Sequence, residues 1–149
     1  MKFRLVIAIL AMSIGVFGQA TPKMSAAEKE IRAFFDGYAE DLRQHRTEAI
    51  ADRYDRRGTY LLGNGGKELV SFEDNNLYYT TKWKGPKSFV WKDFSFEIIS
   101  KTAVVAIGKF EWQGEKDVAP ATCSYSGLLI KTSGKWRIRV EDESCPPPK

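Results

Sequence analysis

The first strong pattern in the sequence is a set of apolar residues at helical spacing behind a helix-capping segment. Ser25-Ala26-Ala27-Glu28 has the Ser-x-x-Glu pattern of a capping box, in which each end residue bonds a backbone N–H group of the other. This pattern predicts an amphipathic helix that ends near His45. Its apolar face consists of Ile31, Phe34, Phe35, Tyr38 and Leu42.

Shorter elements are predicted between this helix and the C-terminal half. Thr47 is a suitable cap for a second, short helix. A short apolar strand is expected over Thr59–Leu62, followed by a glycine-rich turn over Gly63–Gly66. Ser71 is a suitable cap for a third helix over Phe72–Trp83.

From Ser88 onward the pattern changes to long runs rich in β-branched and aromatic residues. Short turns separate these runs, which predicts an antiparallel meander. Helices followed by such a sheet indicate an α+β domain with the helices on one face of the sheet. The four expected strands are Ser88–Ile99, Ala103–Gln113, Ala121–Lys131 and Lys135–Glu143.

Alternation along the last two strands predicts which residues face the helices. If Thr132 pairs with Trp136 across the Ser133-Gly134 turn, opposed positions sum to 268 and even-numbered residues share one face. The apolar residues of that face are Leu128, Ile130, Trp136, Ile138 and Val140. Towards the open strand ends the same face becomes polar, with Ser124, Ser126, Asp142 and Ser144. Two interpretations are open: this end lines a pocket, or the strand ends fray into solvent.

The opposite face of the predicted sheet has an apolar set of its own. No predicted helix remains to cover it, and an exposed apolar patch usually marks an interface. Trp91 and Phe94 both have core character but fall on opposite faces of one strand, and a β-bulge there would resolve the conflict. The set consists of Phe89, Trp91, Ile107, Tyr125 and Leu129.

Residues 1–20 have the pattern of a secretory signal peptide. Lys2 and Arg4 precede an uncharged, mostly apolar run, and Gly18-Gln19-Ala20 has small residues at the cleavage-site positions. We expect export to the periplasm or the medium, a folded domain over residues 21–145 and a disordered tail over residues 146–149. The alternative is an uncleaved N-terminal membrane anchor, since the uncharged run is about as short as a spanning helix can be.

The charge balance excludes some partners. The formal net charge of +4 falls to +2 without the leader, which carries two basic residues and no acidic one. No basic stripe stands out, so neither nucleic acid nor, after leader removal, a membrane is an expected partner. A chain of 149 residues with 43% hydrophobic residues suits one globular domain.

The two cysteines are predicted to form a disulfide bond. Cys123 faces Cys145 in the register in which opposed positions sum to 268, and an exported protein meets an oxidising compartment. The alternative is two unpaired thiols. Cysteine catalysis is not expected, because the only imidazole, that of His45, lies at the far end of a predicted helix.

Three stretches together resemble the nuclear transport factor 2-like superfamily, which includes ketosteroid isomerase and the SnoaL-like domains. They are Ile31–Tyr60 with "TEAIADRYDRRGTY", then "FSFEIISKTAVVAIGKFEW", and last "SYSGLLIKTSGKWRIRVEDES". The resemblance covers nearly all of Ser25–Ser144. It implies a cone-shaped α+β barrel, with the N-terminal helices packed in the concave face of a curved antiparallel sheet. It also implies a homodimer through the outer sheet face.

Residue by residue, the resemblance to ketosteroid isomerase is incomplete. The tyrosine that polarises the substrate oxygen corresponds to Tyr38. The position of the general base falls on Leu62, and Ala121–Ser126 contains no acid for the second oxyanion donor. Steroid isomerisation is therefore not expected. Another subgroup ends in W-x-I-x-H-x-H-x-S, and here Val140 and Asp142 replace its two histidines.

These inferences outline a candidate ligand site without a cofactor. Its predicted residues are Tyr38, Tyr60, Trp83, Trp112, Ser124, Ser126, Asp142 and Ser144. Because strand alternation sends Asp142 to one face and Glu141 and Glu143 to the other, no metal site is expected. Glu141 and Arg139 are expected to form outward cross-strand pairs.

The leading functional hypothesis is an exported protein that binds a small apolar or aromatic ligand. The alternative is an isomerase, cyclase or dehydratase in which Asp142 transfers a proton and Tyr38 polarises the substrate. A third hypothesis is a non-catalytic oligomerisation or interaction module with a filled cone. In that case Tyr38 is a core tyrosine and Asp142 a solvated residue at a strand end.

Overall fold

The computed structural model describes residues 24–63, 68–114 and 119–146, in which three helices pack against a six-stranded sheet. The predicted leader, and residues 147–149 of the predicted tail, lie outside the described residues. No helix among the described residues is long and apolar enough to cross a membrane.

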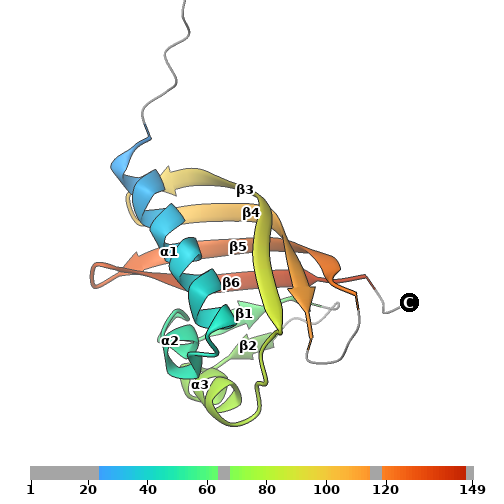
Figure 1. Cartoon of the computed structure of the whole chain (residues 1–149). Coiled ribbons are helices and arrows are strands. Elements are labelled where there is room, and N and C mark those ends of the chain that lie inside the picture. Colours follow the sequence, from blue (N-terminus) through green and yellow to red (C-terminus); the bar gives the residue numbers. More distant parts are fainter. Residues whose placement is uncertain (1–23, 64–67, 115–118, 147–149) are drawn as a thin grey trace, which may run out of the picture.

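The first predicted helix is present as α1 (Ala26–Arg43), which lies across one face of the sheet (Figure 1). It begins with the predicted capping box. The Ser25 hydroxyl accepts a hydrogen bond from the Glu28 N–H group at 3.1 Å, and the Ser25 N–H group donates to the Glu28 carboxylate at 2.7 Å. The apolar face of α1 is buried against the sheet through Ile31, Phe35, Tyr38 and Leu42.

Two shorter helices lie side by side near β1 and the edge strand β2 (Figure 1). They are α2 (Thr47–Ala51) and α3 (Phe72–Thr81). Ser71 caps α3 as predicted, because its hydroxyl accepts a hydrogen bond from the Asp74 N–H group at 3.0 Å. The second and third predicted helices are therefore both present.

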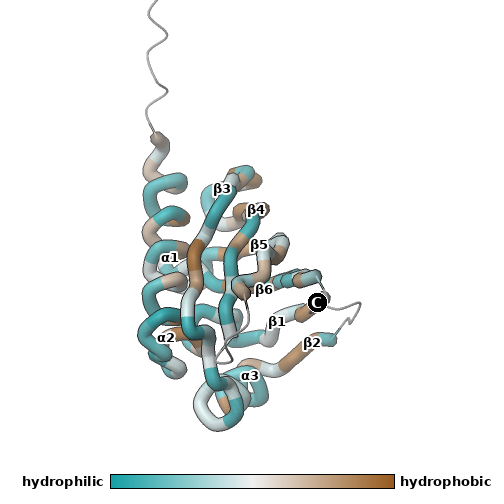
Figure 2. Tube along the Cα trace, turned by 45° about the vertical axis from the view of Figure 1, so that its right-hand side comes forward, coloured by the Kyte–Doolittle hydropathy of each residue, from teal (hydrophilic) through white to brown (hydrophobic). Residues whose placement is uncertain are grey.

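The sheet is curved and has the strand order β2-β1-β6-β5-β4-β3, with the helices on one side (Figures 1 and 2). The last four strands form the predicted antiparallel meander, and β1 pairs in parallel with β6. The unpredicted strand β2 has only three residues, and Leu69 at its centre is exposed, so its sequence has no core-facing pattern. The strands are β1 (Thr59–Leu61), β2 (Glu68–Val70), β3 (Ser88–Ser100), β4 (Ala103–Gln113), β5 (Ala121–Thr132) and β6 (Lys135–Ser144).

The turn between β5 and β6 is tighter than predicted. Ser133 and Gly134 both have positive φ angles, 51° and 78°, as in a two-residue hairpin turn whose twist matches that of the strands. Thr132 therefore pairs with Lys135 and not with Trp136. Next to the turn, the residue numbers of paired positions add up to 267 and not to the predicted 268. This shift of one residue places every β5 side chain on the sheet face opposite to the predicted one.

A β-bulge in β6 restores the predicted pairing further along the hairpin. Leu129 pairs with Ile138, but Leu128 pairs with Val140, so Arg139 is an extra residue in β6. Beyond it, opposed positions sum to 268. The bulge also reverses the alternation along β6, so that odd-numbered residues after Arg139 face the helices.

The turn and the bulge together determine the core. On the inner face β4 contributes even-numbered residues and β5 odd-numbered ones. Trp136 and Ile138 face the helices as predicted, and the Trp136 Nε1–H group donates to Glu30 on α1 at 2.8 Å. The prediction that Leu128, Ile130 and Val140 do so is wrong. The fully buried inner residues include Val104, Ala106, Phe110, Cys123, Tyr125, Leu129 and Ile138.

The predicted irregularity in β3 is present. The register of β3 on β4 shifts between Trp91 and Asp93. Because of this bulge, Trp91 and Phe94 both lie on the inner face, with ring centroids 4.7 Å apart. The shift thereby resolves the conflict between the two aromatic residues.

The outer sheet face carries exposed apolar residues, among them Val90 and Ile107, but not the predicted set. Of the five predicted there, only Ile107 is on that face, 56% exposed, while Phe89, Trp91, Tyr125 and Leu129 pack inside. The tight turn moved the β5 residues inward, and Phe89 and Trp91 pair with inner residues of β4. The homodimer stays a prediction.

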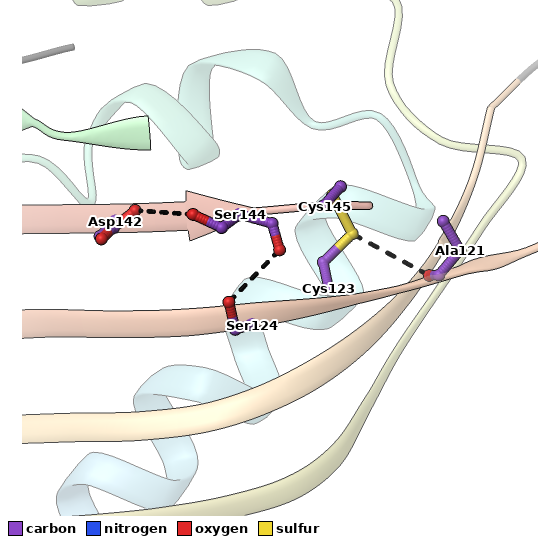
Figure 3. The surroundings of a disulfide bond; sticks show 6 residues. All are labelled: Ala121, Cys123, Ser124, Asp142, Ser144 and Cys145. Carbon is purple, nitrogen blue, oxygen red and sulfur yellow. Dashed lines mark hydrogen bonds between the residues drawn. A yellow bond between two sulfur atoms is a disulfide. The ribbon is translucent and has the colours of Figure 1, made fainter. Parts of the chain in front are cut away.

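The predicted disulfide is present between Cys123 on β5 and Cys145 just after β6 (Figure 3). Cys123 is buried in the core. The pairing is correct even though the predicted register at the turn is wrong, because the bulge at Arg139 restores the sum of 268 before the cysteines are reached.

Candidate functional site

A pocket of about 610 Å³ opens between α3, β1, β2, β4 and β6, and we call it the acidic aromatic pocket. Its volume lies in the range of small-molecule sites. The lining combines aromatic rings with three glutamates: Leu61, Gly63, Glu68, Tyr78, Tyr79, Trp83, Trp112, Glu141 and Glu143.

Glu141 is the most buried acidic side chain of this pocket, with 6% of its surface exposed. The bulge at Arg139 turns it towards the helices. Its Oε2 atom accepts a hydrogen bond from the Tyr54 hydroxyl at 2.8 Å, whereas its Oε1 atom is buried without a partner among the described residues. Such an unpaired atom costs about 1–3 kcal/mol of stability, so Glu141 has bonding capacity that the folded chain does not use.

Three tyrosines from the helical part of the chain meet behind Glu141. The Tyr54 hydroxyl lies 2.9 Å from the Tyr38 hydroxyl and 2.7 Å from the Tyr79 hydroxyl. A hydroxyl donates one hydrogen bond and accepts up to two, so Tyr54 donates to Glu141 while Tyr38 and Tyr79 donate to Tyr54. The three hydroxyls thus form a converging network that ends on one carboxyl oxygen.

Burial controls the ionisation of the two inward-facing glutamates. It raises the pKa of Glu141 well above 4.5, and the charge of Glu143 adds to this, while the Tyr54 and Tyr125 hydroxyls oppose it. Burial, and then the charge of Asp142, raises the pKa of Glu143 to about 7. Burial therefore favours the neutral form of the Glu141 carboxyl group, and Glu143 gains or loses its proton near pH 7.

Tyr125 brings a second buried polar group to the same place. Its hydroxyl is buried without a hydrogen bond of normal geometry among the described residues, and it lies close enough to Glu141 to lower the pKa of that carboxyl group. Gly127 lies opposite Glu141 in the sheet, and a Cβ atom on it would approach the Tyr125 hydroxyl to 2.7 Å. Glycine therefore leaves the room that the Tyr125 ring needs beside Glu141.

Aromatic rings form the wall of the pocket. The ring centroids of Tyr79 and Trp83 lie 5.5 Å apart, and those of Trp83 and Trp112 lie 6.5 Å apart. His45 meets Trp83 edge to face at 5.8 Å, and its Nε2 atom lies 2.8 Å from the Pro86 carbonyl oxygen. The only imidazole of the chain thus supports the wall from behind.

The structure brings two of the four predicted aromatic site residues together in this pocket. Trp83 and Trp112 line the pocket. Tyr38 is buried behind it, as in the interpretation of this residue as a core tyrosine, although it belongs to the network that reaches Glu141. Tyr60 is not in the pocket lining, and the Arg139 guanidinium lies over its ring at 5.3 Å.

The structure does not place the predicted residues Ser124, Ser126, Asp142 and Ser144 in the pocket lining. All four are even-numbered residues beyond the bulge and lie on the outer face, where Ser126 pairs with Asp142 and Ser124 with Ser144. Figure 3 shows the Ser144 hydroxyl donating to Asp142 at 3.2 Å, and the Ser124 hydroxyl donating to the Ser144 carbonyl oxygen at 3.3 Å. The catalytic role expected for Asp142 is therefore not supported.

The residues that replace this set were missed. Glu141 lines the pocket and so forms no outward cross-strand pair, and Glu143 shares its inward orientation. The signal that pointed to them was the Glu-Asp-Glu run itself, since a one-residue change of register turns two acids inward at once. Across the described residues, no three His, Cys, Asp or Glu side chains are grouped as metal ligands.

Replacing Tyr54 by Phe is expected to lower the free energy of unfolding by about 2 kcal/mol, because the buried Tyr54 hydroxyl connects two tyrosines to Glu141. Urea unfolding followed by circular dichroism measures this change. Tyr78→Phe is the matched control, since Tyr78 is 49% exposed, and we expect a change below about 0.5 kcal/mol. Equal effects of both substitutions would contradict the role of the network.

Solved structures with a similar fold are numerous, although no protein-family model and no curated protein matches the sequence. One is an NTF-2-like protein of unknown function from Shewanella oneidensis, with a TM-score of 0.69, 16% identity, and 79% of this chain and 98% of that chain covered.

Two further similar structures have other descriptions. A protein of unknown function with a cystatin-like fold from Nostoc punctiforme has a TM-score of 0.66 at 14% identity, with 85% of this chain and 96% of that one covered. The hexachlorocyclohexane dehydrochlorinase LinA-type3 from Novosphingobium barchaimii has a TM-score of 0.66 at 11% identity, with coverage of 83% and 89%. The chain therefore has the nuclear transport factor 2-like fold that its sequence resembles.

Proposed function

We propose that the chain binds a small, largely apolar or aromatic molecule in the acidic aromatic pocket. The observation that carries this proposal is the Oε1 atom of Glu141, which is buried and unpartnered in a side chain that lines the pocket. Ligand sites typically combine apolar walls with a few such polar groups. Trp83, Trp112 and Tyr79 supply the apolar area.

The protonation of Glu141 suggests how it contacts a ligand. Burial raises its pKa well above 4.5 and so favours the neutral, protonated carboxyl group. Since Oε2 accepts from Tyr54, the proton of the neutral carboxyl belongs on Oε1. A ligand carbonyl or hydroxyl oxygen accepts this proton in a hydrogen bond and satisfies a buried group at the same time.

Export is part of the proposal. It is supported by the basic and apolar leader pattern of residues 1–20 and by the Cys123–Cys145 disulfide, since disulfides persist in oxidising compartments. The intact mass of protein recovered from the periplasm or the medium tests it. The mass expected for a chain that begins at Thr21 supports export, and the mass of a chain that retains Met1 contradicts it.

Binding is tested with benzyl alcohol as the probe, by following the four tryptophan indole N–H signals in ¹H–¹⁵N spectra. We expect saturable shifts for Trp83 and Trp112, and none for Trp136. Leu61→Trp fills the pocket and should abolish the shifts, whereas the matched control Leu77→Trp, on the exposed side of α3, should keep them. Equal binding by both variants would contradict the proposed site.

Proton transfer is the second candidate function, favoured by the pKa of about 7 of Glu143. Its test is the exchange of the methyl hydrogens of acetophenone in D₂O. The Glu143 carboxylate takes a proton from the methyl carbon, and the enolate then takes a deuteron from the exchanged carboxyl group. We expect faster exchange with the unmodified protein than with Glu143→Gln; equal rates would contradict catalysis and leave the binding proposal standing.

A further inference from the structure

Among the described residues, the acidic aromatic pocket is lined by acidic and not by basic side chains, although the chain as a whole has more basic than acidic residues. The chain has a formal net charge of +4, yet the described residues that line the pocket include three glutamates and neither Lys nor Arg. Glu68 comes from the edge strand β2, and Glu141 and Glu143 come from β6. An ionised carboxylate in a partly dry pocket is costly, and a bound cation offsets that cost.

The aromatic wall adds a second attraction for positive charge. The faces of Trp and Tyr rings attract cations within about 6 Å. Elsewhere this chain uses such contacts itself, with Arg56 over the Phe72 ring at 3.7 Å. In the part of the chain that the structure describes, no Lys or Arg stacks on Trp83, Trp112 or Tyr79. These rings therefore remain available for a cation from outside.

The unpartnered Oε1 atom of Glu141 independently indicates a ligand with a hydrogen-bonding group. It is buried, and its side chain lines the same pocket. A volume of about 610 Å³ and aromatic walls suit an organic molecule and not a bare metal ion, which needs several converging oxygen, nitrogen or sulfur ligands. An organic cation is the ligand class that suits the acidic side chains, the aromatic walls and the buried Glu141 Oε1 atom together.

We propose that the ligand is a small organic ammonium ion. Its charge lies between Glu143 and the Trp83–Trp112 wall, and its oxygen or other acceptor meets Glu141 Oε1. This inference rests on the proposed function, because it names the ligand class of the same pocket.

The test compares choline with 3,3-dimethylbutan-1-ol, a neutral molecule of the same shape in which carbon replaces the charged nitrogen. Binding is followed by the indole N–H signals of Trp83 and Trp112. We expect choline to bind at least about tenfold more tightly than the neutral alcohol, because only choline gains the carboxylate and ring contacts.

Two variants locate the effect. Glu143→Gln should weaken choline binding about tenfold and leave the neutral alcohol unchanged. Glu97→Gln is the matched control, since Glu97 is exposed on β3 and far from the pocket lining, and it should change neither. Equal affinities of the two probes, or no choline binding, would overturn the ammonium inference. If benzyl alcohol also fails to bind, the proposed function falls with it.

Discussion

Alanine at both cysteine positions is expected to lower the free energy of unfolding by about 3 kcal/mol. The disulfide joins residues 22 positions apart, and closing a loop of this size restricts the unfolded chain by about that amount. Alanine is preferred to serine because Cys123 is buried in the core, where an unpaired hydroxyl would add a cost of its own. Urea unfolding measures the change.

The matched control for this prediction is Cys145→Ala alone. It removes the same bond but leaves the buried Cys123 thiol in place, so its loss of stability should be close to that of the double variant. The bond lies next to the end of β6 that carries Glu143, so we also expect weaker ligand binding without it. A loss of less than about 1 kcal/mol in the double variant would contradict a stabilising role for the disulfide.

Replacing Glu143 by Gln is expected to stabilise the protein at pH 8 and to have little effect at pH 4. In the folded protein the pKa of Glu143 is about 7, against an ordinary value of 4.5. Between these values the folded state binds more protons than the unfolded state, so stability falls as the pH rises through this window. Above pH 7 the full loss of folding stability caused by ionising Glu143 is reached. It amounts to at most about 3 kcal/mol, which is an upper bound because the pocket admits water.

Glutamine has no proton to lose and avoids this cost. It also removes the charge that helps to raise the pKa of Glu141, which acts in the same direction. Urea unfolding at pH 4, 6 and 8 measures the difference between the two proteins, with Glu97→Gln as the matched exposed control. A difference that does not depend on pH would show that Glu143 lies in water.

Much of the fold follows from residue pattern alone. The capping box and apolar face of α1, the capped start of α3 and the four long strands are local features, in which spacing reports structure directly. The bulge in β3 was predictable too, because a regular strand would place Trp91 and Phe94 on opposite faces although both have core character. Even the disulfide followed from counting positions along one hairpin.

The facing of the last hairpin was not predictable in the same way. The two-residue turn at Ser133-Gly134 shifts the pairing of β5 with β6 by one residue from the predicted register. The extra residue at Arg139 shifts it back, so the pairing is as predicted at the cysteines but not next to the turn. Strand alternation has a period of two, so the turn reverses the side chains of β5, and the extra residue reverses those of β6 beyond Arg139. The correct disulfide therefore gave no warning that the faces were reversed.

The site was missed for the same reason. With the predicted register, Asp142 occupies the mouth of the pocket and its glutamate neighbours face solvent, which is the ordinary place for acids. The structure instead buries Glu141 against the Tyr54 hydroxyl, an arrangement that depends on three helical segments meeting β6. Such long-range contacts leave no periodic signal in the sequence. Trp83 and Trp112 were found because large aromatic residues mark enclosed surfaces in either register.

The central claim is that the bulge at Arg139 turns Glu143 into the pocket and Asp142 out of it. The most direct test is a ¹³C NMR titration of the side-chain carboxyl groups, with the Glu143 signal assigned from the Glu143→Gln spectrum. We predict a titration midpoint near 7 for Glu143. A midpoint near 4.5 for Glu143, with a raised one for Asp142, would contradict the account.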